Sequence, residues 1–132
     1  MGFRLTTSTR TKNIFEELSK SSTLKPFALS KLAVSMSLNE PTSIEEYKNA
    51  DSNGLELQRA TVTGEFDSIY KALIEVKLGR HITDEEYYPH YMKLHMNRGA
   101  ELLSKIYMYS GGNLEKLLTN LLQKGDSNIW FI

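Results

Sequence analysis

Apolar residues recur along this chain mainly at the three- and four-residue spacing of helices. A Ser/Thr-rich run at residues 8–11 offers N-cap candidates for a first helix over about residues 10–20, with Ile14, Phe15 and Leu18 on one face. Residues 3–7 precede it and predict a short extended segment. Pro26 suits the first position of a second helix, over about residues 26–38. Its predicted core face is Phe27, Leu29, Leu32, Ala33 and Met36.

The middle of the chain predicts a polar loop, a strand and a third helix. Residues 41–54 are polar and end in the turn sequence Asp51-Ser52-Asn53-Gly54. A strand over about residues 55–63 follows. Asp67 is a candidate cap for the third helix, which we expect to end at Gly79. Its predicted core face is Ile69, Leu73 and Val76.

A long fourth helix is predicted from a capping box, Thr83 with Glu86, to about Tyr109. Pro89 predicts a kink or a short first turn that ends there. Gly99 costs about 1 kcal/mol relative to Ala inside a helix, so it indicates close approach of another backbone. The predicted core face is Met92, Met96, Leu103 and Tyr107.

The last part of the chain predicts one more helix and an apolar tail. Asn113 is a candidate cap, and the helix would carry Leu114, Leu117, Leu118, Leu121 and Leu122. The tail ends in Ile129-Trp130-Phe131-Ile132, which we expect to pack on its own domain or on a partner.

Together these elements predict one mainly α domain over residues 1–132, with about five helices and a small β element. It divides into an N-terminal helical hairpin (1–40), an acidic loop with a short strand (41–64), C-terminal helices (65–123) and the tail (124–132). The order of extended segment, helix, turn and helix is that of a ribbon-helix-helix start. The apolar stripes exceed what one small core would absorb, so we expect a homo-oligomer.

Composition narrows the class of protein. The 132 residues are 40% hydrophobic and 24% charged, which is typical of a soluble globular domain. No apolar run is long enough to span a bilayer, and the absence of Cys excludes disulfides and thiolate metal sites. These features predict a cytoplasmic protein.

The 16 basic and 16 acidic residues cancel, but they are unevenly distributed. Residues 1–31 hold six cations and two anions, a local charge of +4, whereas residues 40–67 hold seven anions and two cations, a local charge of −5. A basic head and an acidic middle indicate two surfaces with different partners.

Catalytic and metal sites are not indicated. His90 and His95 are five residues apart, roughly 140° around a helix, so they do not form an i, i+4 ligand pair. No nucleophile elbow or phosphate-binding glycine loop is present, and no cofactor is predicted. The acidic run at residues 84–86 suits a helix N-terminus. Base stacking by Tyr87, Tyr88 and Tyr91 is an alternative to packing, and packing is favoured.

Several motifs resemble one known family. Arg4-Leu5 opens a Ser/Thr-capped helix, and Pro26-Phe27 begins the second. The sequences at residues 37–41 (SLNEP), 50–54 (ADSNG), 64–70 (GEFDSIY) and 94–99 (LHMNRG) complete the set. Over about residues 3–122 the chain resembles DndE, the small subunit of bacterial DNA phosphorothioation (DNA sulfur modification).

The resemblance implies a non-enzymatic, helical, homotetrameric subunit that binds duplex DNA with a preference for nicked sites. It also implies work beside a cysteine desulfurase, a sulfur-transfer subunit and an SMC-like ATPase. Phosphates would be contacted by cations in the basic head: Arg4, Arg10, Lys12, Lys20, Lys25 and Lys31. Lys25 stands where a capping hydroxyl is usual.

Two alternatives remain at this stage. A ribbon-helix-helix repressor would read bases with residues 3–9 and need a palindromic site. A structural adaptor would dock another subunit through the acidic middle, with little DNA contact.

Overall fold

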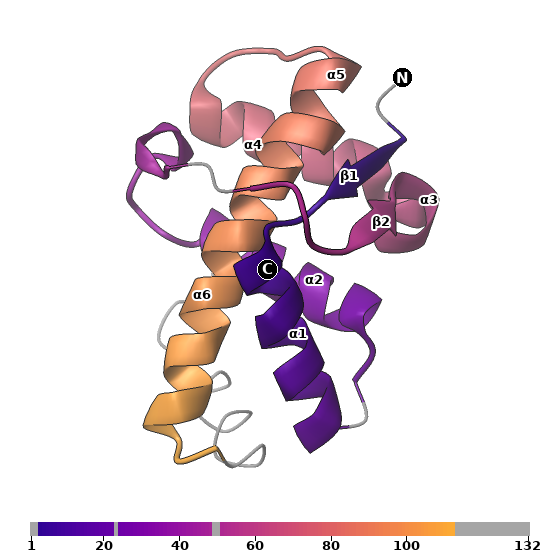
Figure 1. Ribbon diagram of the computed structural model, residues 1–132. Coiled ribbons are helices and arrows are strands. Elements are labelled where there is room, and N and C mark those ends of the chain that lie inside the picture. Colours follow the sequence, from indigo (N-terminus) through magenta and orange to yellow (C-terminus); the bar gives the residue numbers. More distant parts are fainter. Residues whose placement is uncertain (1–2, 23, 49–50, 113–132) are drawn as a thin grey trace.

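The computed structural model describes residues 3–22, 24–48 and 51–112. Two short strands, β1 (Arg4–Thr6) and β2 (Glu56–Gln58), accompany the helices α1 (Thr9–Ser21), α2 (Pro26–Leu38), α3 (Arg59–Val62), α4 (Asp67–Leu78), α5 (Asp84–Glu86) and α6 (Lys93–Tyr109). Single 3-10 turns lie at η1 (Ile44–Glu46) and η2 (Gly64–Phe66), and a π-helical segment, η3, spans Tyr87–Met92. The predicted mainly α class with a small β element is confirmed (Figure 1). No described helix combines the length and apolar character that a bilayer crossing needs.

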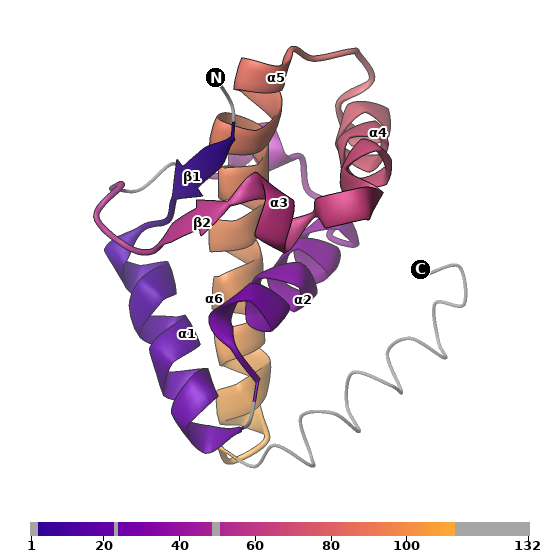
Figure 2. The ribbon, with the colours of Figure 1, turned by 90° about the vertical axis from the view of Figure 1, so that its right-hand side faces the viewer.

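The helix α6 runs through the centre of the molecule (Figure 2). Both α1 and α2 pack against it, and the sheet lies beside η3, at the N-terminal end of α6. The predicted core face of this helix is confirmed, because Met92, Met96, Leu103 and Tyr107 are all buried. The fifth helix and the tail predicted beyond residue 112 lie outside the described residues.

The two strands pair antiparallel, with Leu5 opposite Leu57. The prediction of a strand up to residue 63 is wrong, because residues 59–62 turn into the short helix α3. The turn brings the Thr63 hydroxyl within 2.9 Å of the Arg59 carbonyl oxygen, to which it donates. The ribbon-helix-helix order is present as β1, α1 and α2, but β1 pairs with β2 of the same chain. A ribbon-helix-helix dimer instead pairs its first strand with that of a second chain.

The predicted helix boundaries are largely confirmed. Ser8 caps α1, its side chain accepting a hydrogen bond from the Thr11 amide at 3.0 Å. The Thr83–Glu86 capping box is present, and α4 ends at Gly79, which has the left-handed φ of 78° that favours glycine. Asp67 is the exception, because it is the first residue of α4 and its carboxylate accepts from Arg59, Thr63 and Tyr87 instead of capping the helix.

The segment around Pro89 shows how a long helix accommodates proline. The capping box opens only a short α-helical turn, α5, after which the chain continues as η3 and then as α6. A π-helical segment relaxes the i to i−4 ladder in which the proline ring would clash. The expected short first turn is therefore present.

The core face of α2 differs from the prediction. Its buried residues are Leu29, Ser30, Ala33, Val34 and Ser37. Phe27, predicted to face the core, is 42% exposed. Small residues face α6 because the two backbones come very close: a Cβ on Gly99 would lie 1.7 Å from the Ala33 carbonyl oxygen. The close approach predicted from Gly99 is confirmed.

The predicted core face of α4 is also wrong. Ile69 is 55% exposed and Val76 is 77% exposed, whereas Ile74 is fully buried. The helix is apolar on two sides, and the side that packs on the domain carries Ile74 with half-buried Tyr70 and Leu78.

Candidate nucleic-acid interface

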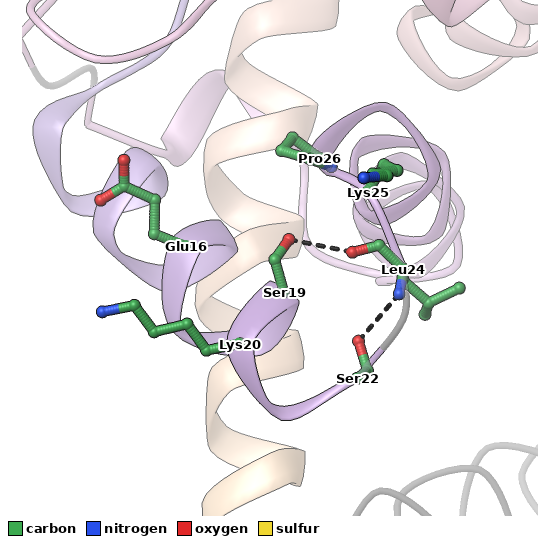
Figure 3. Close-up of a pocket in the computed structure, with 7 residues that line it drawn as sticks. All are labelled: Glu16, Ser19, Lys20, Ser22, Leu24, Lys25 and Pro26. Carbon is green, nitrogen blue, oxygen red and sulfur yellow. Dashed lines mark hydrogen bonds between the residues drawn. The ribbon is translucent and has the colours of Figure 1, made fainter.

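Two of the predicted DNA-binding residues, Lys20 and Lys25, line one open pocket of about 740 Å³. The pocket lies where α1 ends and α2 begins. Glu16 and Lys20 come from α1, and Lys25 and Pro26 lie across from them at the start of α2 (Figure 3). The lining is completed by Ser19, Ser22 and Leu24.

The loop between the two lysines is held by hydrogen bonds from its serines. The Ser19 hydroxyl donates to the Leu24 carbonyl oxygen at 2.9 Å, and the Ser22 hydroxyl donates to the Leu18 carbonyl oxygen at 2.8 Å. The Leu24 amide in turn donates to the Ser22 oxygen at 3.1 Å. These bonds fix the distance between the end of α1 and the start of α2, and so position Lys20 and Lys25.

The start of α2 adds positive electrostatic potential to the pocket. Lys25 is the N-cap residue and makes no side-chain capping bond, and the first turn of α2 has no acidic residue. The positive end of the helix dipole is therefore not neutralised within α2. Glu16, which also lines the pocket, reduces the net charge there.

The other predicted cations are spread over the basic head. Arg4 pairs with Glu56 at 2.9 Å across the sheet, and Arg10 lies 4.0 Å from Glu101. The Lys31 ammonium lies 5.7 Å from the centre of the Phe27 ring. Lys12, Lys20 and Lys25 form no ion pair with any described residue.

The geometry of α1 divides these residues between two sides. Its buried face carries Thr11, Ile14, Phe15 and Leu18. Arg10 and Lys12 lie roughly 200° apart around the helix, on opposite flanks of that face. Lys12 and Lys20 are eight residues apart, roughly 80° around the axis and about 12 Å along it. Lys12, Lys20 and Lys25, which we call the basic ridge, therefore form the most contiguous part of the predicted set.

The motifs that carry the family resemblance do not contribute to this ridge. Residues 94–100 are all buried, and Arg98 donates to the Ser37 carbonyl oxygen at 2.7 Å and to the Thr42 carbonyl oxygen at 2.8 Å. The Asn97 side-chain oxygen accepts from the Ser8 amide and the Thr11 hydroxyl. These motif residues join α1 and α2 to α6.

The Asp51–Gly54 turn has a similar structural role. The Asp51 carboxylate accepts from the amide and the hydroxyl of Thr9, at 2.8 and 2.9 Å. These hydrogen bonds hold the pKa of Asp51 below its usual value, together with one from the Asn53 amide, the largest contribution. A Cβ on Gly54 would lie 2.2 Å from the Ser8 carbonyl oxygen, so the turn packs directly against the start of α1.

Buried histidine and tyrosine side chains lack the access that ligand binding needs. Ser37 accepts from Arg98, so its hydroxyl proton is directed to Nδ1 of His95 at 2.8 Å. Burial lowers the pKa of His95 to about 3, and the charges of Arg98 and Lys77 add to the effect. Tyr87, Tyr88 and Tyr91 are also buried, which excludes them as a base-stacking platform. Among the described residues, no three His, Cys, Asp or Glu side chains gather as metal ligands would.

The structure thus presents a small, mainly helical domain in which an exposed basic ridge lies on a rigid two-helix support. A model of the family described as DNA sulphur modification protein DndE matches residues 4–110 of this 132-residue chain. The chain belongs to the DndE family, and membership implies involvement in DNA sulfur modification alongside the other subunits of that system. No curated protein matches the chain.

Proposed function

We propose that this chain is a non-catalytic subunit that binds the DNA backbone during DNA sulfur modification. The observation that carries the proposal is the pocket in which Lys20 and Lys25 flank the uncapped start of α2. Two ammonium groups and a helix N-terminus suit a phosphate oxyanion. Lys12 extends the ridge along α1, so that two or more phosphates of one duplex are within its reach.

The interaction is electrostatic and independent of base sequence. Each phosphate neutralised by a lysine releases condensed counterions, so affinity falls as salt rises. Arg4, Arg10 and Lys31 are further candidates at the margins of the ridge. Preference for nicked duplex and assembly as a homotetramer are part of the proposal, on the basis of the family resemblance.

The test compares Lys20→Ala/Lys25→Ala with a matched control, Lys48→Ala/Lys105→Ala, which removes two exposed lysines outside the basic head. Fluorescence anisotropy with a labelled duplex of about 30 base pairs, intact or nicked, is recorded at several salt concentrations. We expect the slope of log affinity against log salt to fall by roughly 0.9 for each phosphate that is no longer neutralised, and the control to keep the wild-type slope. An unchanged slope in Lys20→Ala/Lys25→Ala would contradict this assignment.

The oligomeric part of the proposal is tested separately. Light scattering of the purified chain at micromolar concentration should give about four times the chain mass of 15.1 kDa. A monomer mass would contradict it. Because several copies would touch one duplex, an oligomer would also multiply the effect of each lysine substitution.

A further inference from the structure

The surface of α4 that faces away from the domain is apolar. Phe66, Ile69 and Val76 are 54, 55 and 77% exposed, and half-buried Leu73 lies between them. We call Phe66, Ile69, Leu73 and Val76 the α4 stripe. A surface helix normally turns polar residues to the solvent, so a helix that is apolar on both sides indicates a second packing partner.

The stripe is presented by a rigid support. Arg59 contacts the Asp67 carboxylate at 2.6 Å, and the Thr63 hydroxyl donates to the same carboxylate at 2.6 Å. The hydroxyl of buried Tyr87 donates to it as well, at 2.9 Å. This cluster fixes the first turn of α4 to η3 and to α3, so docking on the stripe would cost little conformational entropy.

The size of the stripe fits one helix. Its three most exposed side chains present roughly 300 Å² of apolar surface, the size of the largest patch on a typical monomer. A stable dimer interface buries about 800 Å² on each partner, so this patch alone is too small for one. Spacings of three and four residues along the stripe match the apolar face of a single amphipathic helix.

The charges around the stripe select the kind of helix. Nearby cations already have internal partners: Lys71 contacts Asp84 at 3.3 Å, Lys77 donates to the Glu40 carbonyl oxygen, and Arg80 contacts Glu86. Glu65 and Glu85 are exposed and form no ion pair with a described residue. The charge left for a partner is therefore acidic, and a second copy of the stripe would bring like charge.

We propose that the α4 stripe is a docking surface for an amphipathic helix of another protein, with Lys or Arg flanking its apolar face. This surface is distinct from the basic ridge, which lies on α1 and at the start of α2. Each can therefore fail independently of the other in an experiment.

The test uses a synthetic 18-residue helical peptide, labelled with fluorescein, whose Leu residues at i, i+3, i+4 and i+7 are flanked by Lys. A second peptide carries Glu in place of Lys, and a third carries Ser in place of Leu. We expect the full chain to bind the first peptide with micromolar affinity and the other two at least tenfold more weakly. Equal binding of the first two peptides would overturn the charge argument, and absence of binding would overturn the proposal.

Substitutions locate the binding site. Ile69→Ser/Val76→Ser should weaken the first peptide at least tenfold, while Met108→Ser, which alters another side chain that is 72% exposed, should change it less than twofold. Val76→Thr, an isosteric change at the most exposed position, is a second variant if the double variant is poorly folded by circular dichroism. Binding that survives both variants would place the peptide elsewhere and overturn the proposal.

Sedimentation velocity distinguishes the alternative occupant. We expect the mass of Ile69→Ser/Val76→Ser to equal that of wild type, because the stripe does not join copies of the chain. A fall in mass would assign the stripe to a contact between copies and overturn the proposal. Duplex affinity should be unchanged in the same variant.

Discussion

The helices α2 and α4 are both apolar around most of their circumference, yet they are used in opposite ways. In α2 the side that faces α6 holds small residues such as Ser30 and Ala33, and the bulky Phe27 is left partly exposed. In α4 the buried side holds Ile74, and bulky residues also cover the outer side. The difference shows that the shape of the neighbouring helix, rather than hydrophobicity alone, selects the buried face.

The largest expected effect comes from closing the gap between α2 and α6. Gly99→Ala would raise intrinsic helix stability by about 1 kcal/mol, but its Cβ would lie 1.7 Å from the Ala33 carbonyl oxygen. The steric term is larger, so we expect a net loss of about 3 kcal/mol or more in the free energy of unfolding. Urea denaturation measures it. Ala72→Gly on exposed α4 is the control and should lose only about 1 kcal/mol.

Two isoleucines of α4 provide the matched comparison within one helix. Ile74→Ala removes a fully buried side chain and should lower the free energy of unfolding by about 2–5 kcal/mol. Ile69→Ala, at a position 55% exposed, should change it by less than about 0.5 kcal/mol. Similar losses in thermal or urea unfolding would mean that α4 does not bury the face described here.

The polar contact between α2 and α6 predicts a pH effect. Folding depresses the pKa of His95 from an ordinary value near 6.5 to about 3, mainly through burial. The unfolded chain therefore binds a proton between these values that the folded chain does not, so stability is complete above pH 6.5 and falls as the pH falls. We expect a loss of about 2–3 kcal/mol between pH 6.5 and 4.5.

His95→Gln tests this assignment, because glutamine can accept the bond from Ser37 and does not titrate. Its free energy of unfolding, measured by urea denaturation at several pH values, should be nearly flat over this range. A slope equal to that of wild type would show that another group is responsible.

The smallest expected effect concerns the first residue of α2. Lys25→Ser supplies the missing cap and should raise the free energy of unfolding by about 0.5–1 kcal/mol. The same change removes an ammonium group from the pocket, so duplex affinity should decrease. An increase in stability without a decrease in affinity would separate Lys25 from the DNA interface.

Local signals in the sequence predict most helix ends because capping depends on a few neighbouring residues. Ser8, Pro26, Gly79 and the Thr83–Glu86 box all act as their chemistry predicts. The faces of α2 and α4 could not be read from periodicity, since each helix has two apolar sides and only the neighbour decides between them. The strand error at residues 59–62 has a similar origin, because Arg59 is drawn into a helical turn by its contact with Asp67.

The candidate site was predictable as a composition and not as an arrangement. The excess of cations before residue 32 identifies the basic head. Which of them come together depends on the turn between α1 and α2, which brings Lys25 across from Lys20. Arg4 and Arg10 have carboxylate partners from β2 and α6 that no local pattern reveals.

The central place of α6 has a consequence for how the chain matures on the ribosome. Asn97 holds the amide of Ser8, 89 residues earlier, and α1 and α2 have no other long helix among the described elements to pack on. At 5–20 residues per second, synthesis separates the two ends of this contact by roughly 5–20 s. During that interval the basic hairpin is exposed without its core, so the domain folds as one unit only after α6 has left the exit tunnel.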